Sequence, residues 1–84
     1  MNETDRAIVQ LLDEVLSLAG RSQGFTRDTH LMGAIPELDS MAVVTLLTSI
    51  EEQFGVMVDD DEVDGSLFAT VGTLSDFVQQ KLTA

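Results

Sequence analysis

The 84-residue sequence contains no cysteine, tryptophan or tyrosine, and it contains only one proline. Without cysteine the chain cannot form disulfides or thiolate metal sites, and it cannot carry out thiol catalysis. No apolar run approaches the ~18 residues that a membrane-spanning helix needs. The polar, acidic segment from Met1 to Asp5 is unlike a signal peptide. From these absences we expect a soluble, cytoplasmic protein.

Basic residues are also scarce: 4 Lys and Arg stand against 15 Asp and Glu, which gives a formal net charge of -11. Nucleic acids and anionic membranes attract basic surfaces, so this charge argues against both as partners. From Asp28 to Gln80 the chain carries acids and no base. That stretch is either a solvated surface that keeps a small domain soluble or a docking face for basic partners, and composition leaves both interpretations open.

Hydrophobic residues make up 44% of the chain, enough for one small core, so we expect residues 1–84 to form a single domain. Apolar residues at three- and four-residue spacing predict helices over about residues 4–19, 40–54 and 73–82. Residues 66–69 allow one short helical turn. No stretch alternates with period two for long enough to form a sheet. The predicted fold class is all-α, a bundle of three main helices plus one short helix with a long loop between the first two.

Residues with known capping preferences mark the ends of the first and last helices. Asn2 or Thr4 is expected to cap the first helix, and Gly20 is expected to end it. Thr73, with Asp76 three residues later, is similar to a capping box and predicts the start of the last helix.

The connection between the first two helices, residues 20–39, has no apolar periodicity. Loops of this length in small domains are usually functional or disordered. Pro36 restricts the backbone shortly before the second helix, and four apolar residues resemble anchors to the bundle: Phe25, Leu31, Ile35 and Leu38. Asp39 and Ser40 are capping residues ahead of the second helix, and Gly55 follows it. We therefore expect the loop to present Asp39-Ser40 at a helix N-terminus.

Ser40 taken alone is an ordinary capping residue. The chain lacks the Gly-x-Ser-x-Gly elbow of many hydrolases, and its one histidine, His30, lies in the loop with no sequence relation to Ser40. A catalytic interpretation of the serine therefore lacks its partners. A helix N-terminus, however, offers free N–H groups and a partial positive charge, which suit a phosphate esterified to that hydroxyl.

The segment around Ser40 resembles the acyl carrier protein family. The resemblance covers nearly the whole chain and rests on the long loop, the acidic linker and two segments, Leu38-Asp39-Ser40-Met41 and Ile50-Glu51-Glu52-Gln53-Phe54-Gly55-Val56. It implies that a phosphopantetheinyl transferase attaches 4'-phosphopantetheine from coenzyme A to Ser40. The thiol of that arm would carry an acyl group as a thioester. The protein would be a carrier and not an enzyme, and it would shuttle the group among partner enzymes at high effective concentration.

The same resemblance implies roles for residues near Ser40. Asp39 is expected to cap the helix and to help present the serine to the transferase. Met41 and Val44 match apolar positions that partners contact, and Glu51 and Glu52 match acids that meet basic patches on acyl ligases, synthases or transferases. We expect a monomer whose bundle interior shelters part of the acyl chain.

The second helix departs from the pattern of fatty-acid carriers because its exposed face has few acids. The residues that leave this face nearly neutral are Ala42, Thr45, Thr48 and Ser49. This difference argues against a housekeeping fatty-acid role and favours a dedicated ligase or transferase partner. The segment is also similar to D-alanyl carrier proteins, so an aminoacyl cargo is an alternative. A further alternative, from another class, is an acidic interaction module that is never modified.

The acidic linker partly matches a calcium-binding loop. Asp60, Glu62, Asp64 and Gly65 fall at positions 1, 3, 5 and 6 of an EF-hand, but the twelfth position is Val71 instead of a bidentate Glu. We therefore predict no specific metal site. Weak divalent binding at Asp60, Glu62 and Asp64 would only relieve repulsion among the acids.

Overall fold

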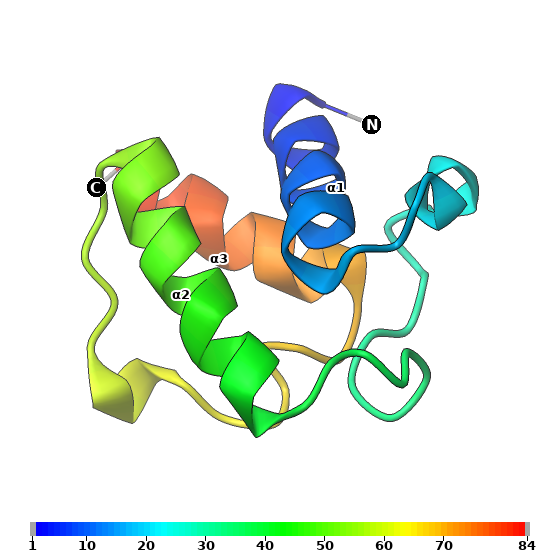
Figure 1. Cartoon of the computed structure of the whole chain (residues 1–84). Helices are drawn as coiled ribbons and strands as arrows, with labels where there is room; N and C mark the ends of the chain where they lie inside the picture. Colours follow the sequence, from blue (N-terminus) through cyan, green and yellow to red (C-terminus); the bar gives the residue numbers. More distant parts are fainter. Residues whose placement is uncertain (1, 84) are drawn as a thin grey trace.

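The computed structural model describes residues 2–83, apart from the side chain of Asp60. Three α-helices carry the fold (Figure 1): α1 (Glu3–Leu16), α2 (Ser40–Phe54) and α3 (Val71–Thr83). Two short 3-10 helices lie in the connections, η1 (Arg21–Gly24) and η2 (Asp60–Glu62). The part of the chain that the structure describes contains no β-strand, and the all-α prediction is confirmed.

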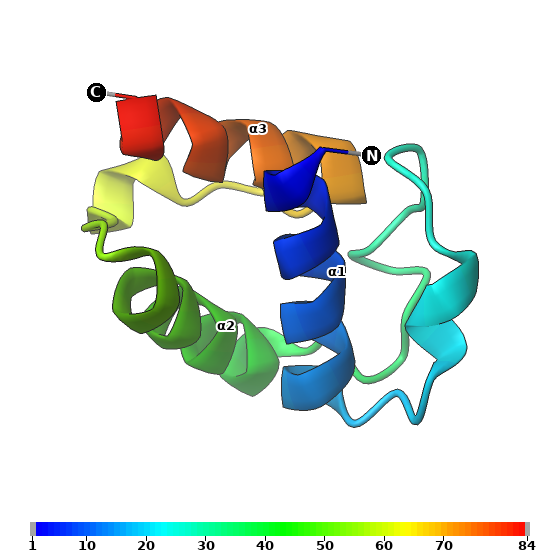
Figure 2. The same cartoon turned by 90° about the horizontal axis from the view of Figure 1, so that it is seen from above.

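The helices surround one core instead of lying parallel to one another. α1 packs against both α2 and α3, and α3 crosses the N-terminal end of α1 when the molecule is seen from above (Figure 2). The core draws on all three helices and on both long connections. Its fully buried members include Ile8, Leu12, Leu18, Leu31, Leu46, Ile50, Phe68, Leu74 and Val78. Among the described residues, no helix has the length and apolar character needed to cross a membrane.

The first helix is shorter than its sequence pattern predicts, ending at Leu16 instead of about residue 19. Ser17 takes a left-handed conformation with φ 55, and its N–H donates to the carbonyl of Asp13. This turn directs Leu18, only 1% exposed, into the core. Burying a leucine contributes about 1.5–3 kcal/mol, which offsets the cost of about 1–2 kcal/mol for a left-handed serine. Gly20 therefore lies in the loop and does not end the helix.

The helix starts follow the predicted caps in two of three cases. Asn2 caps α1, since its side chain accepts from the N–H of Asp5 at 2.8 Å, and α2 has the predicted bounds. The predicted box of Thr73 with Asp76 is wrong. Thr70 and Thr73 form the reciprocal pair instead, with two N–H to Oγ1 bonds of 3.1 Å, because α3 begins at Val71 and Thr73 therefore lies within its first turn.

The short helix predicted at residues 66–69 is not there. Two separate turns occupy this segment: the Leu67 N–H donates to Asp64, and the Ala69 N–H donates to Ser66. Consecutive turns place Leu67 and Phe68 in the core, at 6% and 1% exposure. The short helices of the fold lie instead at residues 21–24 and 60–62.

The long first loop is anchored, as its apolar residues predict. Leu31 and Leu38 are buried, and Phe25 and Ile35 are partly buried against the core. Residues 27–32 also run beside residues 68–72, joined by four backbone bonds of 2.8–3.0 Å: Leu31 to Ala69, Met32 to Phe68, Val71 to Thr29 and Gly72 to Arg27. A Cβ on Gly72 would lie 3.0 Å from the Arg27 carbonyl oxygen, so a larger residue here would displace the Arg27 backbone by a few tenths of an ångström.

Candidate functional site

Ser40 is the first residue of α2, and its side chain is exposed. The capping bond comes from the preceding residue: Asp39 is extended, with φ -111, and its carboxylate accepts from the Ala42 N–H at 2.9 Å. Asp39 thus fulfils the capping role that its position predicts. The hydroxyl of Ser40 is therefore not needed to cap the helix and stands at the positive end of its dipole.

The segment that leads to Ser40 is held by Arg21. Its guanidinium pairs with the carboxylate of Glu37, and its Nε donates to the carbonyl of Leu18 at 3.1 Å. The bond from Arg21 holds the pKa of Glu37 below its ordinary value. Leu38, 5% exposed, follows directly and inserts into the core. The backbone before Ser40 is therefore tied on both sides, by an ion pair and by a buried leucine.

Met41 and Val44 lie on the outer face of α2. Met41 is 76% exposed and Val44 is 61% exposed, which makes them two of the most exposed large apolar side chains described. They are three residues apart and therefore lie on one face of the helix, next to Ser40. The structure thus brings both predicted docking residues beside the candidate attachment residue.

The two glutamates predicted to meet partners lie in different surroundings. Glu51 is partly buried, and its Oε2 accepts from the Val58 N–H at 2.9 Å, so it fastens the segment that follows α2. Glu52 is exposed. The sequence predicts the same role for both glutamates. Among the described hydrogen bonds, however, Glu51 has an internal partner and Glu52 has none.

The acids of the linker serve internal contacts. Glu62 Oε1 accepts from Lys81 Nζ at 2.6 Å, and the bond from Lys81 lowers the pKa of Glu62. Asp64 accepts from the Ser66 hydroxyl and from the Leu67 N–H, and the bond from Ser66 lowers the pKa of Asp64. The described residues contain no group of three or more His, Asp or Glu that could hold a metal ion, and the Asp60 side chain lies outside them.

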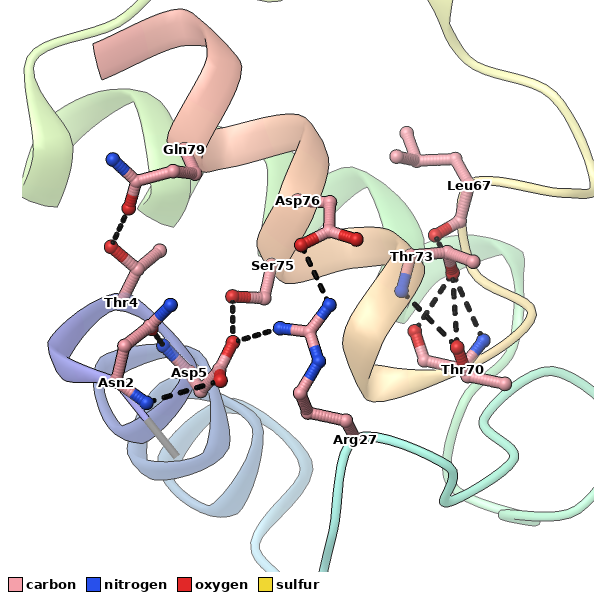
Figure 3. A network of polar contacts seen from close by, with 10 residues as sticks. All are labelled: Asn2, Thr4, Asp5, Arg27, Leu67, Thr70, Thr73, Ser75, Asp76 and Gln79. Carbon is pink, nitrogen blue, oxygen red and sulfur yellow. Dashed lines mark hydrogen bonds and ion pairs between the residues drawn. The ribbon is translucent and has the colours of Figure 1, made fainter. Parts of the chain in front are cut away.

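An ionic cluster centred on the buried Asp5, the Arg27 network, joins α1, the loop and α3 (Figure 3). It consists of Asn2, Asp5, Arg27, Ser75 and Asp76. Asp5 is 1% exposed, and its Oδ1 accepts from Arg27 Nη1 at 2.6 Å and from the Ser75 hydroxyl. Its Oδ2 accepts from the Asn2 N–H at 3.2 Å, and Arg27 Nη2 reaches Asp76 at 2.7 Å.

Burial raises the pKa of Asp5, but the hydrogen bonds from Ser75 and Asn2 and the charge of Arg27 outweigh burial and lower the pKa overall. The carboxylate is therefore held ionised inside the protein. Sequence reasoning missed this network because its partners are 22, 49 and 70 residues apart. The one local signal is an acid in the first turn of an amphipathic helix on its apolar side.

An open hollow with a volume of about 480 Å³ lies between α1 and η1. Val9 and Phe25 form its apolar part, and Arg6 and Asp13 form its polar rim. Ser40 is not among its lining residues. The hollow therefore belongs to a different part of the surface from the exposed serine.

Comparisons with known proteins identify the family to which the chain is similar. A family model described as a phosphopantetheine attachment site matches residues 6–78. The chain is also similar to the solution NMR structure of a holo acyl carrier protein from Nitrosomonas europaea, with 44% sequence identity, 100% of each chain covered and a TM-score of 0.91. No curated protein matches the chain.

Proposed function

The chain belongs to the acyl carrier protein family, whose members carry covalently attached 4'-phosphopantetheine, and from that premise we propose that Ser40 is the residue that holds the arm. One observation carries the assignment: Ser40 opens α2 with an exposed side chain, while Asp39 forms the capping bond. A serine at this place is free to be esterified without loss of the cap. The partial positive charge of the helix N-terminus favours the phosphate of the ester.

The reaction that loads the arm is a phosphoryl transfer catalysed by a transferase. The Ser40 oxygen forms a bond to the phosphorus that carries pantetheine in coenzyme A. The pyrophosphate bond breaks, adenosine 3',5'-bisphosphate leaves, and the transferase accepts the hydroxyl proton. Asp39 keeps the first turn of α2 formed during this step, and the anchored loop holds the serine outward. When bound, the arm supplies a thiol that holds an acyl group as a thioester.

The chain works as a carrier through its partners. Membership of the family implies interaction with a phosphopantetheinyl transferase and with synthase enzymes. We propose that residues 1–84 act as one monomeric carrier domain in the cytoplasm, where coenzyme A is available, and that they catalyse no reaction themselves. Acyl ligases, synthases or transferases with basic patches would load and unload the arm. The nearly neutral face of α2 favours a dedicated partner, so an aminoacyl group such as D-alanine is the second candidate cargo.

Intact-protein mass spectrometry tests the assignment. The chain is incubated with coenzyme A, magnesium and a broad-specificity phosphopantetheinyl transferase, beside Ser40→Ala and the control Ser49→Ala on the same helix. We expect the wild type and Ser49→Ala to gain one phosphopantetheine and Ser40→Ala to gain none. Modification of Ser40→Ala would place the arm elsewhere. A folded wild type that several transferases leave unmodified would favour the unmodified interaction module.

A further inference from the structure

Arg21 bonds both to the segment that follows α1 and to the loop that leads to α2. Its Nε donates to the carbonyl of Leu18 at 3.1 Å, and its Nη2 donates to the carboxylate of Glu37. Leu18 is 1% exposed, so the residue that holds the guanidinium is itself fixed by the core. A guanidinium presents its donors in one rigid plane, so the bond at Nε also orients the donor that faces Glu37. Arg21 therefore connects a fixed point of the core to the loop before Ser40.

Glu37 connects Arg21 to the cap of α2. Its backbone carbonyl accepts from the Asp39 N–H at 3.2 Å, and the Asp39 carboxylate in turn accepts from the Ala42 N–H at 2.9 Å. Leu38 lies between the two acids and is buried in the core. The bonds of Arg21, Glu37 and Asp39 thus form a continuous series, the Arg21 series, which ends in the first turn of α2.

The carboxylate of Glu37 is only partly open to water. Its side chain is 34% exposed, and its Oε1 is buried without a hydrogen-bond partner among the described residues. A carboxylate oxygen shielded in this way loses hydration, and a nearby positive charge offsets that loss. Arg21 supplies the charge through its bond to Oε2. Without Arg21 we expect the Glu37 side chain to turn out to water, which would displace its carbonyl from the Asp39 N–H.

We infer that Arg21 and Glu37 are positioning residues for the modification of Ser40, because they set the conformation of the segment that presents the serine to the transferase. This inference rests on the proposed function of Ser40. The ion pair itself contributes little to the free energy of unfolding, since its side chains are 58% and 34% exposed. Placement of a reacting hydroxyl is far more sensitive, because a displacement of about 1 Å lowers rates by up to about a hundredfold.

Single-turnover kinetics with a broad-specificity phosphopantetheinyl transferase in excess test this inference. Coenzyme A and magnesium are saturating, and intact-protein mass spectrometry gives the rate of modification at each transferase concentration. We expect Arg21→Gln and Glu37→Ala each to lower the maximal rate by about fivefold and to change the half-saturating transferase concentration by less than about twofold. A purely structural role would instead raise that concentration, because fewer chains are folded, and would leave the maximal rate unchanged.

Three further variants sharpen the test. The double variant Arg21→Gln/Glu37→Ala should be no slower than either single variant, because both remove the same interaction. Arg21→Lys keeps the charge without the planar donors and should recover part of the rate. The control Arg6→Gln removes a base of α1 that forms no ion pair among the described residues, and it should leave both kinetic values unchanged.

Two kinds of result separate this inference from the proposed function. Equal maximal rates for Arg21→Gln and Arg6→Gln, or additive losses in the double variant, would overturn the positioning role while Ser40 is still modified. Absence of modification in the folded wild type would instead overturn the proposed function itself.

Discussion

The Arg27 network and the exposed face of α2 satisfy their polar groups in opposite ways. This face, the α2 stripe, consists of Met41, Val44, Thr45 and Thr48. In the network, side chains from α1, the loop and α3 bond to one another, and Asp5 is 1% exposed. In the stripe, each threonine bonds within its own helix, and Met41 is 76% exposed. The network therefore depends on the assembled fold, whereas the stripe depends only on α2.

This difference separates stability from recognition. A change in the network alters the packing of three segments, and we expect it to change the free energy of unfolding. A change in the stripe leaves every internal contact of the core in place, and we expect it to change only how partners bind. The carrier can thus alter its partners without altering its fold.

The largest expected effect breaks the network at its centre. Asp5→Asn removes the charge to which Arg27 and Ser75 bond, and removing one partner of a buried ion pair is costly. Because the side chain of Arg27 keeps some contact with water, we expect the free energy of unfolding to fall by about 2–3 kcal/mol. Urea unfolding measures this loss, with Glu14→Gln, an exposed acid of α1, as the control. The folded variant should still gain phosphopantetheine at Ser40. Equal stability of the two variants would show that the network contributes little to the free energy of unfolding.

Acid should remove the same contribution from the wild type. The pKa of Asp5 is lowered in the folded protein, so its contribution is fully present above the unfolded pKa of about 3.9 and is lost as pH falls through the lower folded pKa. The unfolding free energy of the wild type should therefore fall more steeply below about pH 4 than that of Asp5→Asn. Urea midpoints from pH 7 to 2 give the comparison. Parallel curves would contradict a titrating role for Asp5.

A substitution at Asp39, next to Ser40, should have a smaller effect on stability and should also affect recognition by the transferase. Asp39→Ala removes the cap of α2 and should cost about 1 kcal/mol, whereas Asp39→Asn keeps a capping oxygen and should cost little. Thermal unfolding of the two variants separates the cap from the charge. If Asp39→Asn is modified as fast as the wild type while Asp39→Ala is slower, the cap is what presents Ser40. Equal slowing of both would assign recognition to the charge.

The smallest effect concerns the linker after α2. Lys81 pairs with Glu62 on a partly exposed surface, and such pairs contribute little and are screened by salt. Lys81→Gln should lower the melting temperature by at most about 3 °C at 20 mM NaCl, with a smaller difference at 200 mM. Salt should raise the melting temperature of the wild type by screening the linker acids. A melting temperature that is flat over this range would show that their repulsion is unimportant.

The sequence by itself determined the three helices, the bounds of α2 and the place of Asp39-Ser40 at a helix start. These features are local, because apolar spacing, a capping aspartate and Gly55 act over a few residues along the chain. The resemblance carried by Leu38 to Met41 is local as well. Short-range patterns are therefore enough to single out Ser40 as the candidate attachment residue.

Only the tertiary structure decided where α1 ends, which acids face inward and what Arg27 binds. Leu18 draws the chain into the core at Ser17, although a helix to residue 19 satisfies the apolar spacing. Arg27 meets Asp5 across 22 residues because the loop passes the start of α1. Local patterns contain no information on such pairings, since the partner of a buried charge is set by the packing of distant segments.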